Sequence, residues 1–200
     1  MFVMTVDQQG SRTRGDAVPA LLDRLAVWAA PGSPGVRIGF DRTVGDEVQG
    51  VLDDADVVVR LTLDLLRLGG WTVGIGAGAV DEPLPAAARA GSGPAFVHAR
   101  RAVERAKTRT RPAAVAVEGE TADRAELCEG VLTLVASVRA RRTDAGWAVV
   151  DAVEDGATQD AVAERLGITQ QAVSQRLRTA LWAEERDARP AAARLLEEAV

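Results

Sequence analysis

The sequence predicts an α+β domain at the N-terminus and an all-helical module after it. Up to about residue 119, short apolar and β-branched runs alternate with segments whose apolar residues recur at helical spacing. From Thr121 onward the strand-like runs stop, and amphipathic helical segments follow one another. We therefore expect one domain over residues 1–119 and a second over residues 120–200.

The first elements follow from local patterns. "FVMTV" (2–6) is typical of a strand, and "AVPALLDRLAVWA" (17–29) places its leucines at helical spacing. "VRIGFDRTV" (36–44) alternates apolar and polar residues like a half-buried strand, and "VQGVL" (48–52) returns as its hairpin partner. "DADVVVRLTLDLLRLG" (54–69) begins with aspartates and ends at glycine, which are the start and stop signals of a helix.

The remaining elements continue this pattern. "WTVGIGAGAV" (71–80) alternates larger apolar residues with glycines, which predicts a strand with one nearly bare face, open to close approach. A helix is expected over 93–109 and a strand over 113–119, so the order is β-α-β-β-α-β-α-β. Its core is the ferredoxin-like β-α-β-β-α-β pattern. Helices over 121–142 and 144–154 open the second domain, and three more follow.

Composition narrows the classes of protein to consider. The chain has 200 residues and a formal net charge of −5, so any DNA-binding surface has to be local. Cys128 is the only cysteine and His98 the only histidine, which excludes an intrachain disulfide and a histidine-based metal cluster. The N-terminus does not have the pattern of a signal peptide, and no apolar stretch approaches the ~20 residues of a membrane span. We expect a cytoplasmic protein.

The segment "TQDAVAERLGITQQAVSQRLRTALW" (158–182) carries the clearest functional pattern. Thr158 and Thr169 are suited to cap two short helices, and Gly167 suits the tight turn between them. Apolar residues recur on the inner side of both helices. This is the pattern of a helix-turn-helix whose second helix reads DNA. The alternative is a helical hairpin that packs against a partner or an effector.

The outward side chains of the second helix are polar or basic. Glutamine pairs with adenine, arginine pairs with guanine, and serine and arginine also hold phosphates. No carboxylate lies between Gly167 and Trp182, so the local surface is basic. We expect double-stranded DNA as partner, read by a homodimer because one helix in one groove gives limited affinity. The expected DNA-binding residues are Thr169, Gln170, Gln171, Ser174, Gln175, Arg176 and Arg178.

A second pattern joins the first strand to the hairpin. Asp7 closes the first strand, and Asp46 and Glu47 lie at the predicted hairpin tip. In a ferredoxin-like sheet these strands are neighbours, so Asp7 and Asp46 are expected to face one cleft. Paired carboxylates are the hard oxygen ligands that Mg²⁺ with a nucleoside triphosphate requires. The alternative is an ordinary turn, because Gly-Asp is a common hairpin signal.

The loop after Asp7, "QQGSR", is suited to phosphates because it offers backbone N–H groups and the Arg12 guanidinium. We therefore expect Mg²⁺ as cofactor and a nucleotide effector. The metal-binding residues are Asp7, Asp46 and Glu47, and the loop residues for the nucleotide are Gln8, Gly10, Ser11 and Arg12.

Four pieces of the first domain resemble the palm-type catalytic domain of nucleotide cyclases, which include the GGDEF diguanylate cyclases and the class III adenylyl cyclases. They are Asp7, "GDE" beginning at Gly45, "VGIGAG" (73–78) and the helix segment "AVERAK" ending at Lys107. The resemblance implies metal binding by the acidic residues, and nucleotide contacts by Gly45 and Lys107. Val44 and Val48 depart from the GGDEF pattern.

Over most of its length the chain resembles the bacterial SatD family, which combines "D…SR", a "GDEFQ"-like hairpin (here "GDEVQ", 45–49) and a C-terminal helix-turn-helix. The helix-turn-helix itself is similar to that of sigma-factor region 4. The first hypothesis is a bacterial DNA-binding transcriptional regulator with a nucleotide-sensing domain. The alternatives are a Mg²⁺-dependent nucleotide cyclase or nucleotidyl transferase tethered to DNA, and a scaffold for protein partners.

Overall fold

The computed structural model describes residues 1–108 and 113–200, which form an α+β structure. Every expected strand and helix is present, and a short helix and a 3-10 turn are added. Residue 109, the last of one predicted helix, lies outside the described residues. None of the helices within the described ranges has the length and apolar character that a membrane span requires.

In chain order the elements are β1 (Phe2–Gln8), α1 (Ser11–Arg14), α2 (Val18–Trp28), β2 (Val36–Arg42), β3 (Glu47–Leu52), α3 (Ala55–Leu68), β4 (Trp71–Ala77), η1 (Ala88–Ala90), α4 (Pro94–Thr108), β5 (Val115–Glu118), α5 (Ala122–Ala140), α6 (Asp144–Glu154), α7 (Gln159–Leu166), α8 (Gln170–Thr179) and α9 (Trp182–Glu197).

The strands of the described residues form one mixed sheet in the order β2-β3-β1-β4-β5. Neighbouring strands are antiparallel except β4 and β5, which are parallel. The first strand and the β2–β3 hairpin are therefore neighbours, as the sequence predicts. In the β1–β3 register Asp7 lies opposite Glu47, and Thr5 lies opposite Gln49. Opposite residues of an antiparallel pair project on the same face, so these four side chains share one face of the sheet.

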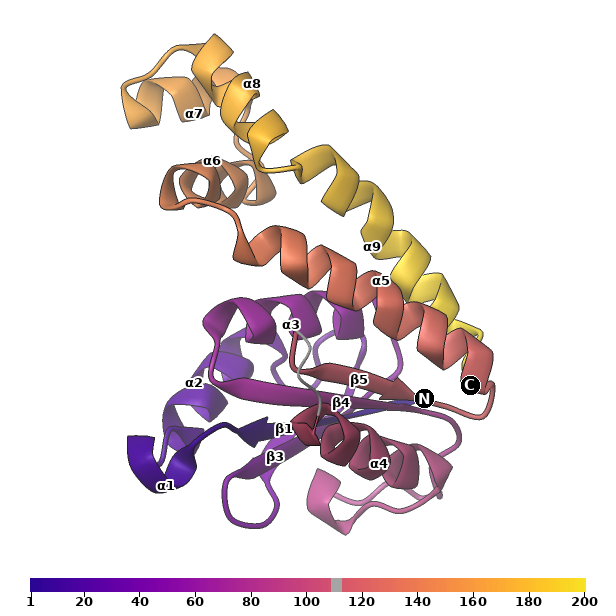
Figure 1. Cartoon of the computed structure of the whole chain (residues 1–200). Helices are drawn as coiled ribbons and strands as arrows, with labels where there is room; N and C mark the ends of the chain where they lie inside the picture. The colour runs from indigo at the N-terminus through magenta and orange to yellow at the C-terminus, as the bar shows by residue number, and fades with distance from the viewer. Residues whose placement is uncertain (109–112) are drawn as a thin grey trace.

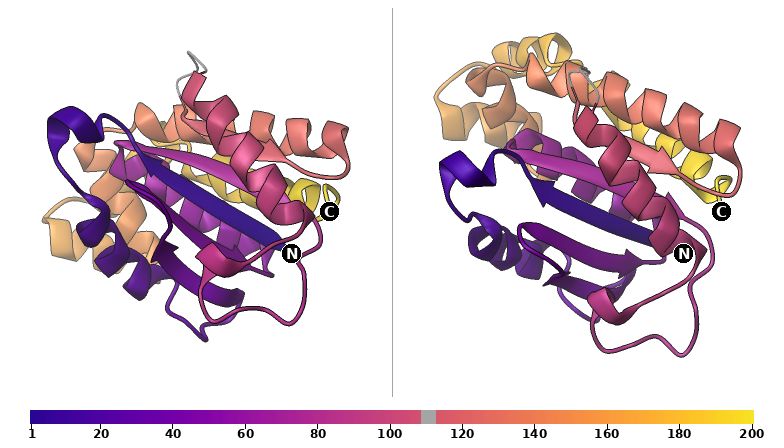
Figure 2. Two further views of the ribbon diagram at one scale, coloured as in Figure 1. Left: turned by 90° about the horizontal axis from the view of Figure 1, so that it is seen from below. Right: turned by 60° about the horizontal axis from the view of Figure 1, so that its bottom comes forward.

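Helices cover the two faces of the sheet in different ways (Figures 1 and 2). α2, α3 and α5 pack on one face against large apolar side chains such as Met4, Val73 and Ile75. α4 lies across the other face, where it packs on β4, β5 and β1 (Figure 2). A Cβ at Gly76 would lie 2.1 Å from the carbonyl oxygen of Ala95 in α4. The bare strand face predicted from the glycines is thus the surface on which α4 packs.

The helical part of the chain is divided between two cores. α5 and α9 lie side by side (Figure 1) and bring Cys128, Leu132 and Leu196 into the same core as the sheet. α6, α7 and α8 have a separate small core that contains Val150 and Val162. The predicted boundary at residue 119 marks where the strands end, whereas the apolar packing places α5 and α9 with the sheet.

A buried ionic cluster lies where the two cores meet. The carboxylate of Glu185, at the start of α9, accepts hydrogen bonds from Arg139 at 2.9 Å, from Arg142 at 2.6 Å and from Arg189. Burial by itself would raise the pKa of Glu185. The three guanidinium groups outweigh burial and hold this pKa below its ordinary value.

Further contacts tie α6 to α3 around this cluster. Arg67 of α3 makes a bidentate pair with Asp151 of α6, at 2.6 and 2.8 Å. The Arg67 guanidinium also lies 3.5 Å from the ring centroid of Trp147, a favourable cation–π distance. Arg139 reaches Asp64 of α3 at 3.0 Å. The module formed by α6, α7 and α8 is therefore attached to the sheet domain by charged contacts in addition to the chain itself.

We expect Glu185→Gln to lower the free energy of unfolding at neutral pH by about 3–5 kcal/mol, because it leaves the buried Arg142 without a counter-charge and Arg139 with Asp64 alone. The folded-state pKa of Glu185 lies below the ordinary value of 4.5, so its contribution is complete above pH 4.5 and is lost as pH falls through the folded value. Urea denaturation over a pH series should show the difference between wild type and variant shrinking below pH 4.5.

The matched control is Glu184→Gln, which changes an exposed neighbour in the same first turn of α9. Its free energy of unfolding should stay within about 0.5 kcal/mol of wild type. Equal losses in the two variants would show that the buried cluster is not what Glu185 stabilises.

Candidate nucleic-acid interface and acidic cluster

α7 and α8 form a helix-turn-helix with the predicted caps. The Thr158 hydroxyl accepts from the backbone N–H of Ala161 at 3.2 Å, and the Thr169 hydroxyl accepts from Ala172 at 3.1 Å. Gly167 ends α7 in the left-handed region at φ 63°, which glycine adopts without steric cost. The local sequence thus sets both helix starts and the turn between them.

Apolar contacts hold α8 in place on the module. Val173 and Leu177 are buried against α6 and α7, and Trp182 packs on the same cluster, as the sequence predicts. Because these residues occupy one side of α8, the opposite side of the helix is left to solvent. The module's small core therefore positions α8 without using its polar side chains.

The predicted DNA-binding residues divide into exposed and half-buried residues in the structure. Gln171, Gln175 and Arg178 are exposed on the outer side of α8. Gln170 is also exposed, and its side-chain amide donates to the Gln159 side chain at 3.1 Å. The half-buried members of the predicted set are Ser174 and Arg176, while Thr169 is exposed at the helix cap.

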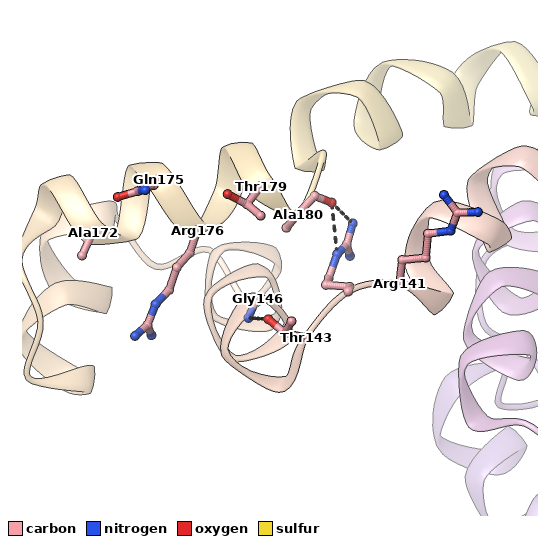
Figure 3. Close-up of a pocket in the computed structure, with 9 residues that line it drawn as sticks. Arg141, Thr143, Gly146, Ala172, Gln175, Arg176, Thr179 and Ala180 are labelled. Carbon is pink, nitrogen blue, oxygen red and sulfur yellow. Dashed lines mark hydrogen bonds between the residues drawn. The ribbon is translucent and has the colours of Figure 1, made fainter.

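A basic cavity of about 290 Å³ lies between α8, the start of α6 and the end of α5 (Figure 3). Gln175 and Arg176 line it from α8, and Arg141 lines it from the end of α5. Thr143, which caps α6 by accepting from the Gly146 N–H at 3.2 Å, completes this side. Three arginines and no carboxylate belong to the lining, and because Arg142 is paired with Glu185, Arg141 and Arg176 are the two whose charge favours anions here. Arg141 and Thr143 are not among the residues predicted from the sequence, because both lie outside the helix-turn-helix segment.

The predicted acidic residues lie at one end of the sheet, on the face that carries α4. The Asp7 carboxylate is 3.0 Å from the Lys107 ammonium, which is also 2.9 Å from Glu104. The Glu47 carboxylate accepts from the Thr43 hydroxyl at 2.7 Å and from Arg100 at 3.3 Å. Both predicted strand carboxylates therefore have a cationic partner on α4.

The pKa values reflect this arrangement. Burial raises the pKa of the Asp7 carboxyl above its ordinary value, the hydrogen bond from Lys107 opposes that rise, and the charges of Asp46 and Glu104 add to it. Burial would lower the pKa of Lys107, but its hydrogen bonds to Glu104 and Asp7 raise it overall. The charge of Asp46 thus acts on the Asp7 carboxyl, and a cleft shared by the two side chains stays a prediction.

The phosphate loop predicted after β1 is largely engaged in its own structure. The Gln8 side chain donates to the Gly15 carbonyl at 2.6 Å and accepts from the Ala17 N–H at 2.9 Å, which closes the loop. Gly10 adopts φ 69° at the start of α1, a conformation that favours glycine, while Ser11 is half-buried. Arg12 and Gly45 are exposed. Gln8 therefore stabilises the loop through its side-chain hydrogen bonds, and the Arg12 side chain is accessible to solvent.

Two residues of this face were missed by the sequence analysis. Arg100 reaches Glu47, and its position seven residues before Lys107 places both on one side of α4, a spacing that could have identified it. Asp41 lies opposite Gln49 in the β2–β3 register, and its Oδ1 is buried with no hydrogen-bond partner within the described residues. A bulge in β2 sets this register, and no sequence pattern marks it.

Comparisons with known protein families, with curated proteins and with solved structures give no significant match for this chain. Within the described part of the chain, no group of three or more His, Cys, Asp or Glu side chains is arranged to hold a metal ion. The roles of the two regions are therefore argued from their geometry.

We expect Lys107→Met to raise the pKa of Asp7 further, because it removes the hydrogen bond and the positive charge that lower it. An NMR titration of the Asp7 side-chain carboxyl carbon measures the midpoint directly. Lys107→Arg keeps the charge and should titrate close to wild type. A midpoint unchanged in Lys107→Met would mean that the ion pair does not persist in solution.

Proposed function

We propose that the protein is a DNA-binding regulator that reads double-stranded DNA with α8. The observation that carries this proposal is the exposed, carboxylate-free side of α8, held by a capped helix-turn-helix with its own core. Its glutamines and arginine are the side chains that pair with purine edges in the major groove. The resemblance of the segment to the helix-turn-helix of sigma-factor region 4 and of the SatD family favours the same function.

The basic cavity next to α8 also supports the proposal, because it offers contacts to DNA phosphates. Phosphate contacts orient a reader on the duplex, and such contacts use arginines, hydroxyl groups and helix N-termini. Arg176, the Thr143 hydroxyl and the capped start of α6 offer all three next to α8. The net charge of −5 over the whole chain disfavours DNA elsewhere on the surface, so binding would be confined to this end of the molecule.

The test begins with selection of duplexes from a random-sequence pool at low salt, followed by fluorescence anisotropy on the enriched sequence. We expect Arg178→Ala to weaken binding about tenfold or more, corresponding to the ~1–3 kcal/mol of a direct base contact. Arg101→Ala, an exposed arginine of α4, is the control and should bind like wild type. A pool that is not enriched at all would contradict DNA reading and favour a scaffold for protein partners.

A second candidate function is binding of a nucleotide with Mg²⁺ on the α4 face of the sheet, as the resemblance to cyclase palm domains implies. The observation that favours it is a polar face where Asp7, Glu47, Lys107 and Arg100 meet and where the buried Asp41 Oδ1 has no partner within the described residues. Buried polar atoms without partners are rare and call for an explanation, which a bound cation or its water would supply.

The residues present fit a Mg²⁺–nucleotide pair. Asp7 and Glu47 offer hard oxygen ligands on adjacent strands, and Mg²⁺ needs only one or two carboxylates when phosphates and water complete its shell. Lys107 and Arg100, which now neutralise these carboxylates, would be released towards the phosphates. A bound metal would supply positive charge for phosphate oxygens. A ferredoxin-like or palm-type assignment of the sheet belongs to this proposal.

Calorimetry with ATP, GTP, and cyclic mono- and dinucleotides in the presence of Mg²⁺ tests the second candidate. We expect one of them to bind wild type and binding to be lost in Asp46→Asn, because the variant removes negative charge beside Asp7. Asp23→Asn, at an exposed position of α2, is the control. Release of pyrophosphate that disappears in Asp46→Asn would identify a cyclase-type enzyme. If wild type binds none of these nucleotides, the second candidate function is wrong and the β2–β3 hairpin tip is an ordinary turn.

A further inference from the structure

α5 carries apolar residues on two opposite sides. One side, which includes Leu132 and Val135, is buried against the sheet and α9. On the other side Leu127 is 52% exposed and Leu134 is 66% exposed. Most surface helices have one apolar side and one polar side, so this helix is unusual.

The outer apolar residues form a continuous stripe along the helix. Leu127, Val131, Leu134 and Val138 are separated by four, three and four residues, which keeps them on one side of an α-helix. Leu127 and Leu134 are exposed, whereas Val131 and Val138 are half-buried, and Val131 at the edge of the stripe also packs against the core. This is the spacing with which two helices pack against each other. Leu181, 41% exposed at the start of α9, lies with Leu134 and Val138 around one cavity of about 320 Å³, so the apolar surface continues beyond α5.

Charges of opposite sign close the two ends of the stripe. Asp123 precedes Leu127 by four residues, and Arg141 follows Val138 by three, so both lie in line with the apolar side chains. Both are exposed, and neither forms an ion pair within the described ranges of the chain. The midpoint between Asp123 and Arg141 in the sequence is residue 132. The midpoint between Leu127 and Val138 lies half a residue from it, so the two charges are placed symmetrically about the apolar stripe.

We propose that the stripe is the interface with a second copy of this chain, whose α5 packs antiparallel to the first. A two-fold axis near the middle of α5 brings Asp123 opposite the partner's Arg141 twice, and it brings the apolar residues of the two stripes together. A parallel pair would instead place Asp123 beside Asp123 and Arg141 beside Arg141. Charge and apolar spacing therefore select the same self-complementary arrangement.

The choice of a second copy rests on the proposed DNA-reading function in one respect. α6 begins a few residues beyond the C-terminal end of α5, so an antiparallel pair sends the two helix-turn-helix modules out at opposite ends. With 19 residues in α5 and a rise of ~1.5 Å per residue, these ends are about 28 Å apart. That separation is of the order of the ~34 Å between half-sites one turn of DNA apart.

Sedimentation velocity on the full chain without DNA tests the interface. Wild type is expected to be a dimer, and Leu134→Glu is expected to weaken self-association at least about tenfold, because it places a charge in the apolar centre. Circular dichroism checks that the variant is folded. Val27→Glu changes a residue that is 80% exposed on α2 and should leave the dimer intact.

A charge exchange tests the antiparallel register and does not depend on the apolar centre. Asp123→Arg alone and Arg141→Asp alone should each weaken the dimer, and the double variant should restore it. A monomeric wild type, or a dimer unaffected by Leu134→Glu, overturns the proposal, as does a double variant that is weaker than both single ones. Since no DNA is present, these results are independent of whether α8 reads DNA.

Discussion

The carboxylate of Glu185 is the point on which the arrangement of the molecule depends. It lies at the start of α9, and its three arginine partners come from α5, from the α5–α6 connection and from α9 itself. Two of those arginines are almost completely buried, and Glu185 is the carboxylate that they share, while Arg139 also reaches Asp64. Because α5 and α9 also complete the apolar core of the sheet, the cluster sets the direction in which the α6–α8 module leaves the sheet domain.

This constraint relates the two candidate sites. The acidic cluster lies on the α4 face of the sheet, whereas α3, α5 and α9 lie on the other side. A ligand at Asp7 and Glu47 would act on the helix-turn-helix through α4, whose Arg105 pairs with Glu129 of α5 at 2.7 Å, or by shifting α3. Arg67 of α3 contacts the α6–α8 module, and Asp64 of α3 contacts the ionic cluster around Glu185. Such coupling needs two arrangements of these ion pairs, and the bidentate Arg67–Asp151 pair is the contact that would distinguish them.

Local signals account for what the sequence predicts correctly. The strands and helices follow from apolar periodicity, and the turn before α8 follows from Gly167 and two threonine caps, because each requirement involves only neighbouring residues. The pairing of the first strand with the hairpin also follows, since chain order limits which strands become neighbours. The position of α9 does not follow, because its buried Glu185 is indistinguishable in sequence from the exposed Glu184 beside it.

The same limit explains the acidic face and α5. The Oδ1 atom of Asp41 is buried where the register of β2 against β3 shifts, and the contact of Arg100 with Glu47 depends on how closely α4 packs on Gly74 and Gly76. On α5 the apolar residues recur on both sides, so periodicity indicates a helix without indicating which side faces the sheet. Only the packed structure separates Leu132, which the core uses, from Leu134, which it leaves exposed, and that separation turns an uninformative pattern into a defined surface.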